Sequence, residues 1–207
     1  MEDRQEAIKH LSAFLRAVGA PIDDDPEMKT TAERVTHAYA DHLLSGYQQH
    51  PAEILAEATQ SKSEALVVVG ALPLMTLCPH HLLPAIGTAS LAYLPGGQVV
   101  GFGALARLMA CFARRLSLQE DLAQDVADAL VTHIGAKAAC CLLRLHPSCM
   151  SVERFLPLDT SVTTIAYAGK EARDPLFRSE VAKLFDFSLD PNAPHASGPT
   201  AQDPDVA

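Results

Sequence analysis

The stretch Ile86-Gly87-Thr88-Ala89-Ser90-Leu91-Ala92-Tyr93-Leu94-Pro95-Gly96-Gly97 decides the fold of this chain. Its residues up to Leu94 alternate in character, as they do in a β-strand with one buried face. Pro95-Gly96-Gly97 is a strong turn signal, and Gln98-Val99-Val100 follows it directly. We therefore predict a β-hairpin between residues 86–94 and residues 98–100.

Segments with clear helical or strand periodicity surround this hairpin. Helices are predicted at residues 6–18, 30–46, within 50–60, at 105–112, at 122–134 and from 174 onward. Further strands are predicted at residues 65–69, 139–146 and 160–167. The resulting order is helices, hairpin, two helices, hairpin and a short helix. This order indicates an α+β fold, with an antiparallel sheet that carries helices on one face.

Three regions follow from this pattern. Residues 1–63 form an N-terminal helical region, and residues 64–187 contain the predicted sheet. Residues 188–207 are rich in Pro, Asp, Ser and Ala without apolar periodicity, so we predict a disordered tail. A sheet of this size leaves exposed edges, and joining sheets across subunits is one way to cover them.

Composition excludes several classes of function. The chain has 207 residues and a net charge of −9, whereas general nucleic-acid binders carry a basic footprint. No apolar run approaches the ~20 residues that span a bilayer, so no membrane partner is expected. The N-terminus does not resemble a signal peptide, and five cysteines are an odd number. We therefore expect a cytoplasmic protein whose thiols are free or bound to metal.

The densest group of reactive side chains is Cys78-Pro79-His80-His81. A Cys and a His with two residues between them can bind one zinc ion from a tight turn, although such a pair alone is more often an ordinary loop. A second group, His146-Pro147-Ser148-Cys149, ends a predicted strand and offers Cys149 as a third ligand. Three protein ligands would leave one position of a tetrahedral zinc ion open, as in catalytic sites.

Two other cysteines compete for the role of third ligand. Cys140 and Cys141 lie inside a predicted strand, where neighbouring side chains face opposite ways. At least one of them is therefore expected in the core.

Gln119-Glu120 is a further candidate, with two interpretations. Ser117 and Glu120 have the spacing of a capping box, in which Glu120 would only hold the start of a helix. Alternatively, its carboxylate could accept the two N–H donors of a guanine edge. Arg107 lies on a predicted helix, where arginines are usually solvated but can also bind phosphate.

Several motifs, taken in order, resemble the GTP cyclohydrolase I family, and the resemblance covers residues from about 8 to 187. They are Thr31-Ala32-Glu33-Arg34-Val35, Cys78-Pro79-His80-His81-Leu82-Leu83-Pro84, Ala106-Arg107-Leu108, Ala113-Arg114-Arg115, Leu118-Gln119-Glu120-Asp121-Leu122, Cys149-Met150 and Leu176-Phe177-Arg178-Ser179-Glu180. Several motifs in the family's order are far more specific than any one alone.

The resemblance implies the tunnelling fold for residues 64–187, in which the sheets of several subunits join into a barrel with helices outside. It also implies a large homo-oligomer, typically a decamer of two pentamers, with active sites at subunit interfaces. The family's Zn²⁺ ligands correspond to Cys78, His81 and Cys149. His80 corresponds to the histidine that handles the purine N7 proton, and His146 to a second active-site histidine.

The substrate-binding residues correspond in the same way. Gln119 and Glu120 match the guanine-recognition pair, and Arg107 and Arg34 match arginines that bind the triphosphate. The implied reaction hydrolyses the imidazole ring of a guanine nucleotide at C8, releases formate and gives 7,8-dihydroneopterin triphosphate.

The sequence departs from the family pattern near the phosphates. Gly103 and Ala104 replace the family's serine and lysine, and Pro79 replaces a glutamate. One extra residue precedes Cys149, and a family arginine falls on Glu153, with an arginine beside it. Two alternatives to the implied reaction therefore stand. One is a divergent enzyme acting on a guanine-type compound without the triphosphate, and the other is an inactive relative that serves as a binding subunit.

Overall fold

The computed structural model describes residues 4–152 and 160–188, so the predicted tail lies almost wholly outside the described residues. Its N-terminal elements are α1 (Arg4–Ala17), η1 (Pro26–Met28), α2 (Thr31–His37), the π-helix η2 (Ala38–Leu43), η3 (Ser45–Gln48), α3 (Pro51–Leu55) and β1 (Thr59–Gln60). The elements that follow are β2 (Val67–Leu77), β3 (Pro84–Leu94), β4 (Gln98–Val99), α4 (Phe102–Ala113), α5 (Gln119–Ile134), β5 (Ala138–Pro147), α6 (Ser148–Val152), β6 (Val162–Ala168) and α7 (Pro175–Ser188). None of the helices in residues 4–152 and 160–188 combines the length and the apolar character of a membrane-spanning segment.

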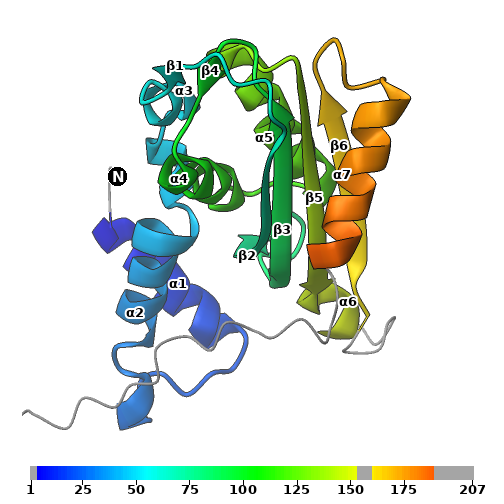
Figure 1. The fold of residues 1–207 in the computed structure, drawn as a ribbon. Helices are drawn as coiled ribbons and strands as arrows, with labels where there is room; N and C mark the ends of the chain where they lie inside the picture. Colours follow the sequence, from blue (N-terminus) through cyan, green and yellow to red (C-terminus); the bar gives the residue numbers. More distant parts are fainter. Residues whose placement is uncertain (1–3, 153–159, 189–207) are drawn as a thin grey trace, which may run out of the picture.

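A four-stranded antiparallel sheet, in the order β2-β3-β5-β6, forms the centre of the chain. Helices α4 and α5 cover one face and α7 covers the other (Figure 1). Leu91, Cys141 and Leu143 point toward α4 and α5, while Cys140 and Leu142 point toward α7. The α+β fold with an antiparallel sheet is therefore confirmed, but helices cover both faces of the sheet rather than one.

The predicted hairpin between residues 86–94 and 98–100 is wrong. Strand β4 pairs with β1, through Thr59↔Val99 and Gln60↔Gln98, and not with β3. The reason is that β3 already has β2 on one edge and β5 on the other. The turn after β3 also packs tightly on the end of α5, since a Cβ on Gly96 would lie 1.9 Å from the carbonyl oxygen of Gly135.

The partner of β3 in a hairpin is instead β2, which is longer than the predicted strand at residues 65–69. A β-bulge between Val69 and Leu72 interrupts the pairing, and Ala71 there has a φ of 54°. The main-chain N–H of Ala71 donates to the hydroxyl of Ser90, 3.2 Å away. Pairing resumes beyond the bulge and continues to Leu77↔Pro84, so β2 and β3 present the connecting loop 78–83 at one end of the sheet.

The predicted helix at 30–46 is correct as far as Leu43, but it widens to a π-helix at Ala38. Thr30 is the N-cap residue of α2, and its side chain makes no capping hydrogen bond. Gly46 does not end the predicted helix, because it lies within the next element, η3. Its N–H donates to the carbonyl of Arg114, 3.0 Å away, and its lack of a Cβ lets η3 pack closely on α4.

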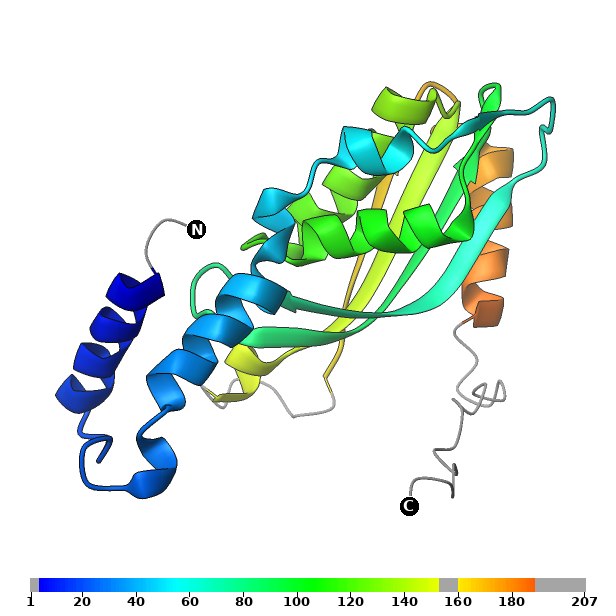
Figure 2. The same ribbon diagram turned by 90° about the vertical axis from the view of Figure 1, so that its left-hand side faces the viewer.

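Helices α1 and α2 pack on each other and extend away from the sheet (Figure 2). No residue of α1 is buried in the single chain. Its apolar positions, including Phe14 at 59% exposure, therefore remain open to a partner or to solvent.

Candidate metal centre

The loop 78–83 folds back on itself and holds three of the predicted site residues. The N–H of Cys78 donates to the carbonyl of Leu83, and the N–H of Leu82 donates to the carbonyl of Cys78, each over 2.9 Å. Leu82 adopts the left-handed conformation with a φ of 55°. This closed turn directs Cys78, His80 and His81 to the same end of the sheet.

Cys149 reaches this loop from another part of the chain. The end of β5 lies beside the start of β3, with Pro147 opposite Ala85. Helix α6 begins directly after β5, and the hydroxyl of Ser148 donates to the carbonyl of Pro84 over 2.6 Å. The extra residue before Cys149 therefore does not prevent its side chain from reaching the loop.

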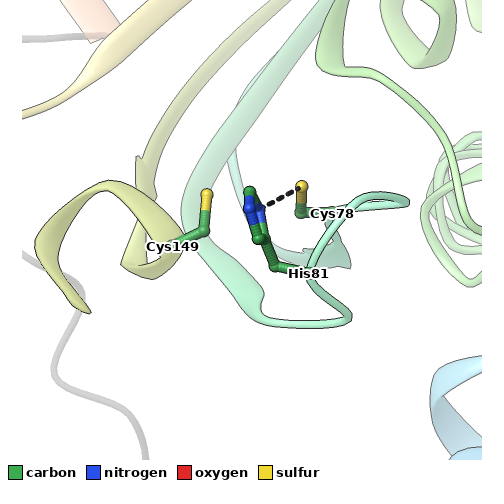
Figure 3. A group of neighbouring side chains, drawn as sticks. All are labelled: Cys78, His81 and Cys149. Carbon is green, nitrogen blue, oxygen red and sulfur yellow. Dashed lines mark hydrogen bonds between the residues drawn. The ribbon is translucent and has the colours of Figure 1, made fainter. Parts of the chain in front are cut away.

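The donor atoms of Cys78, His81 and Cys149 all lie within 4.8 Å of one another (Figure 3). The Sγ of Cys78 lies 3.7 Å from Nδ1 of His81. In tetrahedral zinc, bonds of about 2.3 Å to sulfur and 2.0–2.1 Å to nitrogen put such donors about 3.6 Å apart. Two thiols and one imidazole are also the donors that zinc prefers. The three side chains therefore fit a zinc ion.

The two thiols differ in acidity. Burial raises the pKa of Cys78, but hydrogen bonds from the His80 backbone and the His81 side chain outweigh it, so its pKa is lower than usual. Burial and the neighbouring Cys78 sulfur raise the pKa of Cys149 above its usual value. Without a cation, ionisation of Cys149 is therefore opposed by the neighbouring Cys78 sulfur. A bound metal ion would remove this opposition.

The competing cysteines are core residues, not ligands. Cys140 and Cys141 are both fully buried, and they face opposite sides of β5. Burial raises the pKa of Cys140 to about 12 and also raises that of Cys141. None of the five cysteines, which all lie within residues 4–152, forms a disulfide.

Cys78, His81 and Cys149 form the candidate metal-ligand group. His80 lies beside this group, whereas His146 lies on strand β5. Nδ1 of His80 is 3.9 Å from Sγ of Cys78, and its ring meets that of His81 edge-on at a centroid distance of 6.2 Å. His146 is exposed near the end of β5, opposite Ile86 of β3. Both imidazoles are open to solvent in the single chain.

Gln119 and Glu120 open helix α5, but not as a capping box. The N-cap is Leu118, and the hydroxyl of Ser117 donates to the Leu118 carbonyl, so the capping interpretation of Glu120 is wrong. The amide of Gln119 donates to the carbonyls of Leu143 and Val162, at 3.4 and 3.0 Å. The Glu120 carboxylate is exposed. In the described part of the chain, no hydrogen bond links either residue to the metal-ligand group.

The expected phosphate-binding arginines lie outside the metal-ligand group. Arg107 and Arg114 line a cavity of about 540 Å³ beside α4. The guanidinium of Arg107 donates to Glu57 over 2.5 Å. Ala104 is 2% exposed and is not among the residues that line this cavity, so it contributes no charge there. Arg34 is exposed on α2, and the substituted position Glu153 lies outside the described residues.

Sequence reasoning missed three residues that shape these sites. Ser148 ties α6 to β3, Glu57 pairs with Arg107, and the hydroxyl of Tyr39 donates to the carbonyl of Leu82 over 3.0 Å. Tyr39 lies within the helix predicted at residues 30–46, and its side chain is partly exposed. No local pattern marks any of the three, because each contact joins residues that are more than 40 positions apart.

The chain is similar in sequence to known bacterial proteins. It is 37% identical over 188 residues to a GTP cyclohydrolase 1 of Nitrosospira multiformis, covering 88% of this chain and 95% of the relative. It is also 37% identical over 171 residues to a GTP cyclohydrolase 1 of Chromobacterium violaceum, covering 80% of this chain and 82% of that protein.

Two solved structures are similar to about half of the chain. One is the archaeosine synthase QueF-Like in the apo form, with a TM-score of 0.44 and 18% identity over 53% of this chain and 98% of that one. The other is a dihydroneopterin aldolase from Burkholderia thailendensis bound to guanine, with a TM-score of 0.38 and 12% identity over 56% of this chain and 95% of that one.

The family described as GTP cyclohydrolase I has a sequence model that matches residues 7–186. That match spans most of the described structure, including the loop 78–83, the start of α5 and Cys149. With this coverage and relatives that are 37% identical, the chain belongs to the GTP cyclohydrolase I family.

Proposed function

We propose that this enzyme is a zinc-dependent cyclohydrolase that opens the imidazole ring of a guanine nucleotide at C8. The reaction would release formate and give 7,8-dihydroneopterin triphosphate. The observation that carries the proposal is the convergence of Cys78, His81 and Cys149, whose donor atoms lie within 4.8 Å of one another. Family membership supports a hydrolase of the GTP cyclohydrolase type.

The proposed metal would contribute one property. Zinc held by three protein ligands lowers the pKa of a coordinated water toward about 7, which makes a nucleophile available near neutral pH. Cys78, His81 and Cys149 would hold the ion.

Protonation of the purine is the task proposed for the histidines. C8 of guanine is electrophilic only when N7 is protonated or hydrogen-bonded. The His80 imidazole is exposed beside the ligand group, and imidazole has an unperturbed pKa of about 6.5. His80 would therefore donate the proton to N7, and His146 would act as the second acid or base.

Guanine recognition is proposed for the start of α5. Because the Gln119 amide is held by two main-chain carbonyls, its orientation is fixed, and the exposed Glu120 carboxylate follows on the first turn. That carboxylate can accept from both N1–H and the 2-amino group of guanine.

We propose a homo-oligomer, a decamer by analogy with the family, with residues 64–187 as its catalytic unit. Strands β2 and β6 end the sheet order in the described chain, so each offers an edge to a second copy, apart from the end of β2 where Leu77 bridges to Leu116. The uncovered helix α1 offers a further contact surface. Free thiols throughout the chain fit the reducing conditions of the cytoplasm, where we propose that it works.

A second candidate substrate is a guanine-type compound without the triphosphate. The specific observation is the charge balance beside α4, where Arg107 is paired with Glu57 and buried Ala104 replaces a lysine. A charged hydrogen bond to phosphate contributes about 1.5–3 kcal/mol, so losing even one weakens triphosphate binding by a factor of roughly ten or more. The complete set of metal donors argues against an inactive binding subunit.

One experiment tests these proposals together. The purified full-length protein is analysed for zinc per chain, and formate and pterin are then measured with GTP, GMP, guanosine and guanine. We expect about one zinc ion per chain and formate release from at least one substrate. Preference for GTP with a low KM would support the first candidate, and preference for guanosine or guanine would support the second.

Two variants complete this experiment. Cys149→Ser should lose zinc and activity, whereas Cys140→Ser, a matched change at a core cysteine, should retain zinc. A wild-type protein that binds no zinc, or a Cys149→Ser variant that binds it normally, would refute the proposed metal centre.

A further inference from the structure

Tyr39 connects the N-terminal helical region to the loop 78–83. It lies in the π-helix η2, whose wider turns are visible in the bond from the Leu44 N–H to the Tyr39 carbonyl, five residues back. The Tyr39 hydroxyl donates to the main-chain carbonyl of Leu82 over 3.0 Å. Short π-helical segments are rare and often occur at functional sites, where they redirect a side chain.

The carbonyl that accepts this hydrogen bond belongs to a residue with an unfavourable backbone conformation. Leu82 has a φ of 55°, a conformation that residues with a Cβ adopt only at an energetic cost. Its side chain is 45% exposed, so packing gives limited compensation. An external hydrogen bond to its carbonyl is therefore well placed to stabilise the conformation.

The position of Leu82 in turn determines that of a metal ligand. Leu82 follows His81 directly, and its N–H and the Leu83 carbonyl both bond to the main chain of Cys78. These two bonds lie within the loop, whereas the bond from Tyr39 comes from a separate element. The paired ends of β2 and β3 hold the base of the loop, and the bond from Tyr39 adds a tie at its far side, beside His81.

We propose that Tyr39 is a positioning residue for the metal centre, which acts through Leu82 to hold His81 in place for zinc. Tyr39 donates to main chain, not to a metal donor, so it is not a catalytic residue. The inference rests on the proposed zinc site and adds to it a residue from outside the ligand motif.

The test compares Tyr39→Phe with Tyr93→Phe in the full-length protein. Both changes remove one hydroxyl that bonds to main chain, but Tyr93 is fully buried near the end of β3 remote from the loop, where it accepts from the N–H of Val100. Zinc affinity is measured by competition with a chromogenic chelator. The Co²⁺-substituted proteins are compared by their visible absorption, which reports ligand geometry and is not altered by a loss of stability alone.

We expect Tyr39→Phe to bind zinc about 3- to 10-fold more weakly, the range that one neutral hydrogen bond supports. Its Co²⁺ spectrum should shift, and kcat should fall while KM stays nearly constant. Tyr93→Phe should lower the melting temperature while leaving zinc affinity and the Co²⁺ spectrum unchanged.

Three results would count against the inference in distinct ways. Wild-type zinc affinity and spectrum in Tyr39→Phe would overturn the role of Tyr39 but leave the metal centre intact. Equal losses of affinity in both variants would show a general effect of stability and would also overturn it. A wild-type chain without zinc affinity would overturn the proposed metal centre itself, and with it this role.

Discussion

The hydroxyl of Ser148 donates a 2.6 Å hydrogen bond to the carbonyl of Pro84, which joins the first residue of α6 to the first residue of β3. Cys149 comes next in α6, and the loop with Cys78 and His81 comes directly before β3. The contact therefore links the two segments that supply the proposed zinc ligands.

Replacing Ser148 by Ala should loosen this link. We expect a loss of about 1 kcal/mol in stability, hence a melting temperature about 2–4 °C lower, and zinc binding weakened roughly 5-fold. Calorimetry and chelator competition measure the two effects. Ser117→Ala is a matched control, since its hydroxyl bonds to the carbonyl of the adjacent residue, Leu118. Unchanged zinc affinity in Ser148→Ala would contradict the prediction.

Thiol accessibility separates the ligands from the core cysteines. In metal-stripped protein at pH 8, iodoacetamide should modify Cys78 first, because its pKa is lowered and it is partly exposed. Cys140 and Cys141 should stay unmodified while the protein is folded, since both are fully buried. Peptide mass spectrometry gives the order, and added zinc should protect Cys78. Early modification of Cys140 or Cys141 would be inconsistent with the fold described above.

Alkaline pH should destabilise the protein through Cys140. Burial raises its pKa from 9.0 to about 12, so the folded chain keeps this proton in a range where the unfolded chain loses it. Stability is thus complete below pH 9 and falls as the pH rises toward 12, by at most about 1.4 kcal/mol per pH unit for one group. Urea unfolding of wild type and Cys140→Ala across this range isolates the effect. The prediction fails if both proteins show the same slope.

Glu57 should limit the use of Arg107 by a phosphorylated ligand. Because the pair is exposed, at 52% and 63%, its strength is at most about 1 kcal/mol. We therefore expect Glu57→Gln to tighten binding of inorganic tripolyphosphate by up to about 5-fold, measured by calorimetry. Glu53→Gln in α3 removes the same charge nearby and serves as the control. Equal gains in both variants would point to net charge rather than to Arg107.

The sequence was sufficient for the parts of the structure that depend on local pattern. Apolar periodicity located α4 and α5, and Gly135, with a φ of 65°, ends α5 as predicted. The sequence pattern failed for strand pairing. The turn residues Pro95-Gly96-Gly97 are compatible with a hairpin and also with a chain that leaves the sheet. Which of these forms was decided by the edges of β3, already occupied by β2 and β5. Gly70 and Pro73 likewise concealed the true length of β2.

In the candidate site, too, the sequence predicted some residues and missed others. Metal-ligand spacing and the family's motifs identified Cys78, His81 and Cys149, which the fold brings together. Tyr39 could not be found this way, since its relation to Leu82 exists only once the N-terminal helices are placed beside the loop. The interpretation of Glu120 as a helix cap failed by one residue, because the helix begins after Leu118 rather than after Ser117.

The β-bulge at Ala71 has a consequence for aggregation. A long, flat edge strand is a template on which further chains can add without limit, as they do in fibrils. The bulge between Val69 and Leu72 divides β2 into two stretches that are out of register with each other. An incoming strand that pairs with one stretch loses register with the other, so this edge can accept one matching partner but is a poor template for open-ended stacking.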